Sequence, residues 1–245
     1  MLENSFDHPP VLTAQNLRRS FGSTTALNGV NLHIHLGESL AIMGPSGSGK
    51  STLLHALAGI ELPDSGSIRL NLPGQTSLEL LELRDKARTK LRREAFGFVF
   101  QSGLLIPELT AEENVAMALM INGVSRVAAI EQARQALVAL GLAGMEQRRI
   151  GQLSGGQIQR VAIARAQVTG AMVVFADEPT GALDSSTGTE VLDVLLGCTV
   201  GQGKSLVMVT HDAAVAARCD RVVKLQDGNL ISDSRSVNNM DGGVR

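Results

Sequence analysis

Residues 44–51 read Gly44-Pro45-Ser46-Gly47-Ser48-Gly49-Lys50-Ser51 and fit the pattern G-x-x-x-x-G-K-[ST]. Loops of this pattern wrap a phosphate chain in backbone N–H groups, and glycine lets the main chain close around it without a side-chain clash. Lys50 supplies a positive charge to the outer phosphates, and Ser51 offers a hydroxyl to Mg²⁺. The stretch therefore predicts a polyphosphate site.

The flanking sequence supplies the strand and the helix that such a loop needs. Residues 39–43 are a short apolar run, expected to be a buried strand, and residues 52–58 have helical spacing with Gly59 as the stop. The positive N-terminal end of that helix adds to the attraction for phosphate. A glycine-rich turn that arose by chance is the alternative, and the strand–loop–helix context disfavours it.

A second apolar run, residues 171–176, ends in the carboxylates Asp177 and Glu178. Such a run is typical of a buried parallel strand, and ligands bind at the carboxyl ends of these strands in open α/β sheets. Asp177 is expected to hold Mg²⁺, directly or through water, and Glu178 to orient and deprotonate an attacking water. An acidic turn without function is the alternative, which the glycine loop upstream disfavours.

The stretch Leu153-Ser154-Gly155-Gly156-Gln157 predicts a helix N-terminus. Ser154 and Gln157 have the spacing of a capping box. A cap does not need the two glycines, which clear the helix end for close approach by an anion. The chain is thus expected to hold two phosphate-seeking helix ends.

The remaining pattern alternates strands and helices. Strands are expected at residues 30–36, 96–100 and 206–209, and a hairpin at 222–231 with its turn at Asp227-Gly228. His33 and His35 share the polar face of the first of these strands; a metal pair is the alternative to a solvated face, and no third ligand is near.

Helices are expected at residues 78–93 and then, with few interruptions, from Thr110 to about Gln167. The first carries many charges, which favours a solvated helix, with a docking surface as the alternative. Thr110 and Glu113 form a capping box, and a further helix begins near Ser125 and ends at Gly141 or Gly144. The run is expected to be a helical subdomain, about residues 102–167, inserted into an α/β core. Residues 1–10 and 233–245 are expected to be flexible tails.

The bulk composition narrows the function. The 245 residues include 44% hydrophobic residues, enough for a substantial core, and no Trp or Tyr beside six Phe. The formal charge of −2, with few aromatic rings, indicates no nucleic-acid partner. Cys198 and Cys219 lack metal-ligand spacing and fit buried thiols in a reducing cytosol. Neither a signal peptide nor a membrane span is expected.

Together these motifs resemble the nucleotide-binding subunit of an ATP-binding cassette (ABC) transporter, over about residues 11–232. The resemblance implies an α/β fold: a P-loop NTPase core of mostly parallel sheet, an N-terminal antiparallel β part and the inserted helical subdomain. It identifies residues 44–51 as the Walker A loop, 172–177 with Glu178 as the Walker B strand and catalytic glutamate, and 153–157 as the family signature. The pentapeptide is the most specific of these motifs.

The resemblance also implies roles that single residues do not reveal. Gln101 falls at the Q-loop, residues 181–184 at the D-loop, His211 at the switch histidine and Phe21 at the ring that stacks on adenine, where Tyr is commoner. The implied catalytic residues are Glu178, His211 and Gln101. The implied Mg²⁺ ligands are Ser51, Gln101 and Asp177. The implied ATP-binding residues are Phe21, Gly44, Pro45, Ser46, Gly47, Ser48, Gly49, Lys50, Ser51, Thr52, Ser154, Gly155, Gly156, Gln157 and Asp184.

The same resemblance implies partners. Two copies would pair head to tail, so that Ser154 and Gly156 of one cap the γ-phosphate bound at Lys50 of the other. Residues 91–101 and 109–115 resemble the subgroup that serves macrolide, lipoprotein-release, haem and antimicrobial-peptide exporters and the cell-division pair. That subgroup implies a homodimer at the cytoplasmic face of the membrane, bound to a separate four-span permease whose coupling helix meets residues 101–124.

Three functions stay open on the sequence. The first is a Mg²⁺-dependent ATPase that powers export or extraction of an amphipathic substrate such as haem, a macrolide-like drug, a peptide or a lipoprotein. The second is the ATPase of a transmembrane signalling pair that regulates a cell-wall hydrolase in cell division. The third is a soluble relative in translation or DNA repair, which the single cassette and scarce aromatic residues disfavour.

Overall fold

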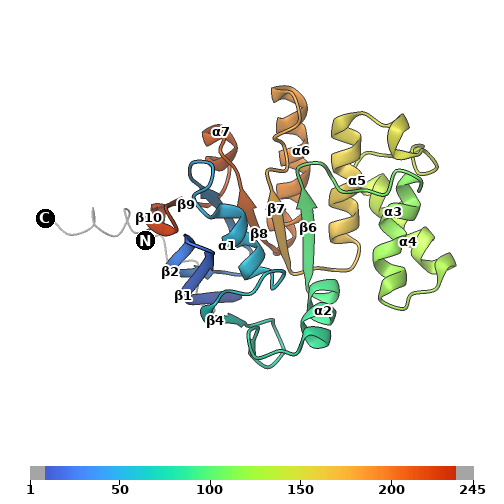
Figure 1. The fold of residues 1–245 in the computed structure, drawn as a ribbon. Coiled ribbons are helices and arrows are strands. Elements are labelled where there is room, and N and C mark those ends of the chain that lie inside the picture. Colours follow the sequence, from blue (N-terminus) through green and yellow to red (C-terminus); the bar gives the residue numbers. More distant parts are fainter. Residues whose placement is uncertain (1–8, 236–245) are drawn as a thin grey trace, which may run out of the picture. The chain divides into compact units, whose positions relative to one another are not determined.

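The computed structural model describes residues 9–235, which fold into two compact units. The first unit comprises the described residues up to Arg88 and those from Val207 onward, and the second runs from Thr89 to Leu206. Most of the two expected tails, residues 1–10 and 233–245, lies outside the described residues. Figure 1 labels the helices and strands of both units.

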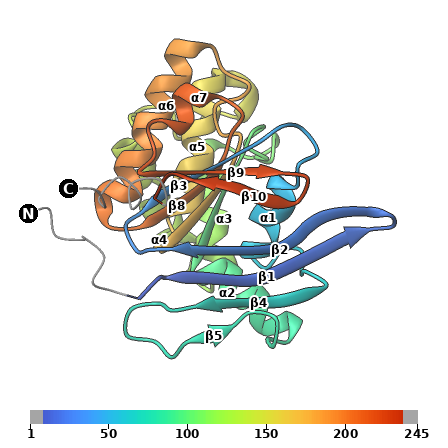
Figure 2. The ribbon, with the colours of Figure 1, turned by 90° about the vertical axis from the view of Figure 1, so that its left-hand side faces the viewer.

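An antiparallel sheet in the first unit has the strand order β2-β1-β4-β5 (Figure 2). Its strands are β1 (Leu12–Phe21), β2 (Thr24–Ile34), β4 (Ser65–Leu70) and β5 (Leu78–Glu79). Val30, Leu32 and Ile34 of β2 are buried and alternate with exposed residues, which is the pattern of a strand with one covered face. The expected strand at 30–36 is confirmed, although it begins at Thr24 and ends at Ile34.

The same unit holds parallel pairing. Strand β3 (Ser39–Met43) runs parallel to β9 (Arg221–Gln226), and β10 (Asn229–Asp233) returns antiparallel to β9. The expected hairpin turn is confirmed: Asp227 and Gly228 have φ of 47° and 73°, the left-handed values that a two-residue hairpin turn requires. Helices α1 (Lys50–Leu57) and α7 (Ala213–Ala216) complete this unit.

In the second unit, β6 (Phe96–Phe100) and β7 (Val173–Asp177) run parallel, with Phe100 opposite Asp177. Gly97 lets helix α5 approach β6 closely, since a Cβ there would lie 2.4 Å from the carbonyl oxygen of Ala166. Strand β8 (Ser205–Val209) lies at the division of the units in sequence. Its first N–H donates to the oxygen of Met172 in the second unit, and the N–H of Thr210, after its end, donates to Ile42 in the first.

Four longer helices belong to the second unit: α3 (Ala111–Ile121), α4 (Arg126–Ala139), α5 (Gly155–Gln167) and α6 (Ser185–Cys198), with short 3-10 turns at Ile150–Gln152 and Val200–Gln202. The expected capping box at Thr110 and Glu113 is confirmed, and Ser125 caps α4 as expected. Helices α3, α4 and α5 share a core rich in alanine, which permits close helix approach.

The expected helix at 78–93 is wrong in its first half. Helix α2 (Asp85–Glu94) begins seven residues later, because residues 78–79 pair with β4 as strand β5 and the N–H of Leu80 donates to Ile68. Leu80 is fully buried against that sheet, whereas α2 itself buries no residue, as expected for a solvated helix. At the other end of the chain, β10 extends to Asp233, one residue into the expected tail.

A buried ion cluster fixes β10 in the first unit. Arg221, 6% exposed, donates to both carboxylate oxygens of Asp233 and to Glu38, which is fully buried. Arg235 also pairs with Glu38, at 3.1 Å. Burial pushes the pKa of Asp233 upward, but the hydrogen bonds from Arg221 and Arg235 hold that pKa below its ordinary value.

We expect Arg221→Ala to lower the free energy of unfolding by about 3–5 kcal/mol, because it removes the buried guanidinium that bonds both oxygens of Asp233 and one oxygen of the fully buried Glu38. Urea unfolding followed by circular dichroism measures this. Arg126→Ala is the matched control, since Arg126 forms an exposed pair with Glu113 that is worth at most about 1 kcal/mol. The part of the free energy of unfolding that the ionised Asp233 contributes is fully present above pH about 4, and it is lost as the pH falls through the lowered pKa of Asp233. Equal losses of unfolding free energy in Arg221→Ala and Arg126→Ala would contradict the prediction.

Candidate functional site

The N-terminus of α1 is the distinctive feature of the residue 44–51 loop. Helices α3 to α7 each begin with a side chain that accepts a backbone N–H, whereas the N-cap of α1 is Gly49, which has none. The first turn of α1 also carries no acidic residue. Unbonded N–H groups and the positive end of the helix are thus left for an anion.

Two glycines allow the loop to press against its own unit. A Cβ at Gly44 would lie 2.1 Å from the carbonyl oxygen of Leu225, and one at Gly49 would lie 2.1 Å from that of Ala26. Gly44, Gly47 and Gly49 all have positive φ, as the sequence led us to expect for some of them.

The C-terminal hairpin supports the loop from behind, which sequence reasoning missed. The N–H of Gly228 donates to the oxygen of Ser48, and the oxygen of Gly228 accepts from Asn28. No local pattern could reveal this, because the partners lie far apart in the chain.

The remaining residues of the loop are placed for ligand access. Pro45, Ser46, Gly47 and Ser51 are exposed, and Lys50 and Thr52 are half-buried. The Lys50 amine donates to the oxygen of Pro45, at 2.7 Å, and can exchange that carbonyl for a phosphate oxygen. The hydroxyl of Ser48 is buried and has no hydrogen-bond partner within residues 9–235.

Phe21, at the end of β1, keeps 45% of its surface exposed. The guanidinium of Arg19 lies 4.7 Å from its ring centroid, in cation–π geometry, and is held by Asp64 and Glu61. Hydrogen bonds from the N–H of Ser20, the larger cause, and from Arg19 lower the pKa of Asp64. The ring is therefore held in place and remains accessible.

His211 follows the end of β8 and is exposed. The N–H of Thr210 donates to Ile42 of β3, so this strand end lies beside the strand that leads into the loop. Asp212 then caps α7. Within the first unit, the fold thus places the histidine at the carboxyl end of a strand, where ligands bind in such sheets.

In the second unit, the structure brings Gln101, Asp177 and Glu178 together. Phe100 pairs with Asp177, and the amide nitrogen of Gln101 lies 3.0 Å from the Cβ position of Gly181. The Cβ of Glu178 lies 3.5 Å from the same position. Sequence reasoning assigned the two carboxylates from the strand pattern, and Gln101 only through the family resemblance.

Glu178 has a left-handed backbone, with φ of 48°. A non-glycine residue in this region is uncommon and carries strain, which concentrates at functional sites. The turn that follows is closed by the N–H of Gly181, which donates to the oxygen of Glu178. The backbone at the expected general base is therefore fixed by this turn.

The signature residues form the N-terminus of α5. Ser154 and Gln157 make the expected capping box, with reciprocal hydrogen bonds of 3.4 and 2.9 Å. Gly155 is exposed, whereas Gly156 is buried within its own chain. The two glycines thus lie in different surroundings, which the sequence did not predict.

Asp184 caps helix α6. Its carboxylate accepts from the hydroxyl of Ser186, at 2.6 Å, and from the N–H of Thr187, at 3.0 Å. These hydrogen bonds lower the pKa of Asp184 well below its ordinary value. The carboxylate stays ionised at neutral pH.

The predicted magnesium ligands divide between the units: Ser51 belongs to the first, and Gln101 and Asp177 to the second. Within residues 9–235 no group of three or more His, Cys, Asp or Glu side chains could hold a metal. Both cysteines are free, and burial raises the pKa of Cys198 to about 11 and that of Cys219 to about 12. None of the helices in the described part of the chain combines the length and apolar character of a membrane span.

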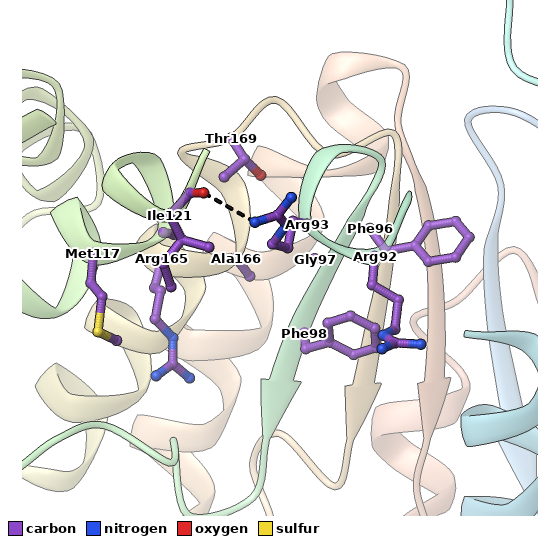
Figure 3. A pocket seen from close by; sticks show the side chains of 11 residues that line it. Arg92, Arg93, Phe96, Gly97, Phe98, Met117, Ile121, Arg165, Ala166 and Thr169 are labelled. Atoms are coloured by element: carbon purple, nitrogen blue, oxygen red, sulfur yellow. Dashed lines mark hydrogen bonds between the residues drawn. The ribbon is translucent and has the colours of Figure 1, made fainter. Parts of the chain in front are cut away.

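A separate cavity of about 250 Å³ lies in the second unit, among α2, β6, α3 and α5 (Figure 3). Its apolar part includes Phe98, Met117 and Ile121, and three arginines also line it: Arg92, Arg93 and Arg165. Arg93 donates to the carbonyl oxygen of Ile121, as Figure 3 shows.

Arg165 of α5 links this cavity to the segment after Gln101. Its guanidinium donates to the oxygens of Gly103 and Leu104, at 2.8 and 2.7 Å, and burial lowers its pKa. Gln159, also on α5, donates to the oxygen of Phe100. Helix α5 therefore holds the backbone on both sides of Gln101.

Comparison with protein families matches residues 27–181 to the family described as ABC transporter. The chain is 43% identical over 238 residues to the pyoverdine export ATP-binding/permease protein PvdT of Pseudomonas aeruginosa, covering 95% of this chain and 35% of that protein. It is 44% identical over 230 residues to the macrolide export ATP-binding/permease protein MacB of Nitrobacter winogradskyi, covering 92% and 35%. The chain therefore spans about a third of the length of these curated relatives.

Solved structures show the same fold. The dimeric ATP-binding cassette MJ0796, in a post-hydrolysis state bound to ADP and Pi, superposes with a TM-score of 0.80 at 38% identity, covering 91% of this chain and 97% of that one. CbiO1 from Clostridium perfringens, part of the transporter complex cbiONQ, gives 0.81 at 28% identity, covering 96% and 92%.

We expect Gly49→Ala to abolish binding of a fluorescent ATP analogue and to lower the melting temperature, because its Cβ would meet the oxygen of Ala26 at 2.1 Å. Gly47→Ala is the control. It has φ of 77° but open space around the added Cβ, so it costs only about 1–2 kcal/mol of backbone strain and keeps the fold. Similar melting temperatures for the two variants would overturn this explanation.

Proposed function

This chain belongs to the ABC transporter family, and from that membership we propose that it binds and hydrolyses ATP to power export by a membrane permease. Its substrate is an amphipathic molecule, in the range of haem, macrolide-like drugs, peptides and lipoproteins. Its relatives include export proteins for pyoverdine and for macrolides, which supports this range. The alternative is a role in a cell-division signalling pair, and the permease partner, rather than a residue of this chain, distinguishes the two roles.

The single observation that carries the ATPase proposal is the N-terminus of α1: its N-cap is Gly49, no side chain caps it, and its first residue is Lys50. The unbonded N–H groups of its first turn and of the loop bind the phosphates, and Lys50 leaves the oxygen of Pro45 for the outer phosphates. Phe21 offers its exposed ring to the adenine, with Arg19 on one face. His211 contacts the γ-phosphate.

Hydrolysis then transfers the γ-phosphoryl group to water. Glu178 accepts a proton as the water oxygen bonds to the γ-phosphorus, and the bond to the β–γ bridging oxygen breaks, releasing ADP and phosphate. The fixed turn from Glu178 to Gly181 positions this base. Gln101, beside the same turn, orients the water.

Oxygen donors suited to Mg²⁺ are present, namely the exposed hydroxyl of Ser51, the side-chain amide of Gln101 and the half-buried carboxylate of Asp177. When bound, Mg²⁺ neutralises phosphate charge during transfer. These three residues hold it in the proposal, and Asp177 carries the negative charge among them.

The active form is a head-to-tail pair of two copies. In each copy the exposed Ser154 and Gly155, with the N–H groups of the α5 first turn including Gly156, face the nucleotide of the other copy. The dimeric state of the relative MJ0796, with ADP and Pi, supports this pairing.

The cavity of Figure 3 receives a segment of the permease, which is of the four-span type and holds the cassette at the cytoplasmic face of the membrane. Its apolar lining and three arginines suit a short helix that carries an apolar side chain and a carboxylate. Arg165 connects this surface with the Gln101 segment through Gly103 and Leu104.

Glu178→Gln tests the hydrolysis step. We expect turnover to fall by at least about 100-fold, since a positioned base is lost, while ATP binding persists. With Mg–ATP the variant should elute as a dimer in size-exclusion chromatography, and wild-type specific activity should rise with protein concentration. Turnover at the wild-type rate in this variant would refute the assignment of the base.

Ile121→Glu tests the docking surface. Ile121 is 52% exposed and lines the cavity, so a carboxylate there is expected to repel the acidic partner segment without unfolding the chain. The measurement is recovery of the permease with the tagged cassette from solubilised membranes, with Val127→Glu as the control, because Val127 is 84% exposed and lies on α4 outside the cavity. Undiminished recovery with Ile121→Glu would exclude this surface.

A further inference from the structure

Gly156 has a steric reason for being glycine that lies inside its own chain. It is buried, and a Cβ there would come 2.5 Å from the γ-methyl carbon of Thr187, closer than real Cβ contacts allow. The next neighbours of that position, Val191 Cγ2 and Thr187 Cβ, lie at 3.8 and 4.0 Å, ordinary contact distances. A single methyl group therefore occupies the space that a side chain at residue 156 would need.

Gly155 provides the contrast. It is exposed, and its Cβ position meets only the Cδ2 atom of Leu183, at 3.0 Å, which is the end of a flexible side chain. Packing inside the chain explains the buried glycine, whereas the exposed one is left for the close approach of the anion that the proposed function requires. The two glycines of the signature are therefore needed for different physical reasons.

Thr187 is itself fixed at the first turn of α6. Its N–H donates to the Asp184 carboxylate, which caps that helix. Farther along the two helices, Arg160 of α5 pairs with Glu190 of α6, at 2.8 Å. The N-terminal turns of α5 and α6 are therefore joined by a close apolar contact, with an ion pair beside it.

We infer that Thr187 is a positioning residue: its γ-methyl, seated against Gly156, locks the signature turn (residues 153–157) to the turn at residues 181–187, so that both face a second copy as one rigid element. The inference rests on the proposed function for its activity readout. In this proposal Thr187 does not contact the nucleotide; it sets the position of the signature turn that faces the nucleotide of the second copy.

A suppressor experiment tests the contact. In the full chain, Gly156→Ala is expected to lower kcat for ATP by at least about tenfold, because the added Cβ would clash with Thr187 and displace the N-terminus of α5. Adding Thr187→Ser removes the methyl, keeps the hydroxyl and should restore kcat to within about threefold of Thr187→Ser alone. Gly197→Ala on α6, where the added Cβ meets nothing within 4 Å, controls for a glycine-to-alanine change in a helix.

Single variants separate the methyl from the hydroxyl. Thr187→Val keeps the γ-methyl and should hold kcat within about threefold of wild type, whereas Thr187→Ser should lower kcat about fivefold. Binding of a fluorescent ATP analogue to the isolated monomer should stay unchanged in both, since the residue 44–51 loop is untouched. If Thr187→Val lowered kcat more than Thr187→Ser did, the proposed role of the γ-methyl would be overturned.

The outcomes distinguish the two proposals. If Gly156→Ala/Thr187→Ser stays as inactive as Gly156→Ala while both melt at the wild-type temperature, the contact with Thr187 is not what restricts residue 156, and the inference fails. If wild type neither hydrolyses ATP nor pairs with it, the proposed function fails instead. The contact is then judged from nucleotide-free melting temperatures: Gly156→Ala should lower the value and Thr187→Ser should restore it, and no restoration rejects the inference.

Discussion

The absence of a Cβ at Gly44 and Gly49 is the constraint on which the candidate site depends. Each glycine lies where a side chain would meet a carbonyl oxygen at 2.1 Å, from Leu225 in one case and from Ala26 in the other. The contact brings the loop against β9 and β2 and leaves the first turn of α1 without a cap. Any larger residue would separate the loop from its support and turn the helix end away from a phosphate.

Features that depend on a few neighbouring residues could be predicted from the sequence. The Walker A loop with its strand and helix, the presence of strands β6 and β7, the capping boxes at Thr110 and Ser154 and the hairpin turn at Asp227 are all as expected. Each rests on hydrogen bonds or periodicity within one or two turns of chain, so local composition is enough to specify it.

What could not be predicted depends on contacts between distant segments. Leu80 follows helical spacing in the sequence, yet its N–H donates to Ile68 of β4 and its side chain is fully buried beside the sheet. Asp233 looks like part of a polar tail, yet Arg221 and Glu38 bind β10 in place. The difference between Gly155 and Gly156 is likewise set by α6, and the roles of Gln101 and His211 came only from family resemblance.

The hairpin at residues 221–233 has a consequence for biosynthesis. Its Gly228 bridges Ser48 and Asn28 through backbone hydrogen bonds, so the phosphate loop acquires its backing only from a segment that leaves the ribosome long after the loop itself. The emerging polypeptide therefore carries an unsupported loop until residue 228 has been synthesised. Competence to hold nucleotide then follows only when β9 and β10 have closed behind the loop, and a product that stops before residue 221 lacks that support.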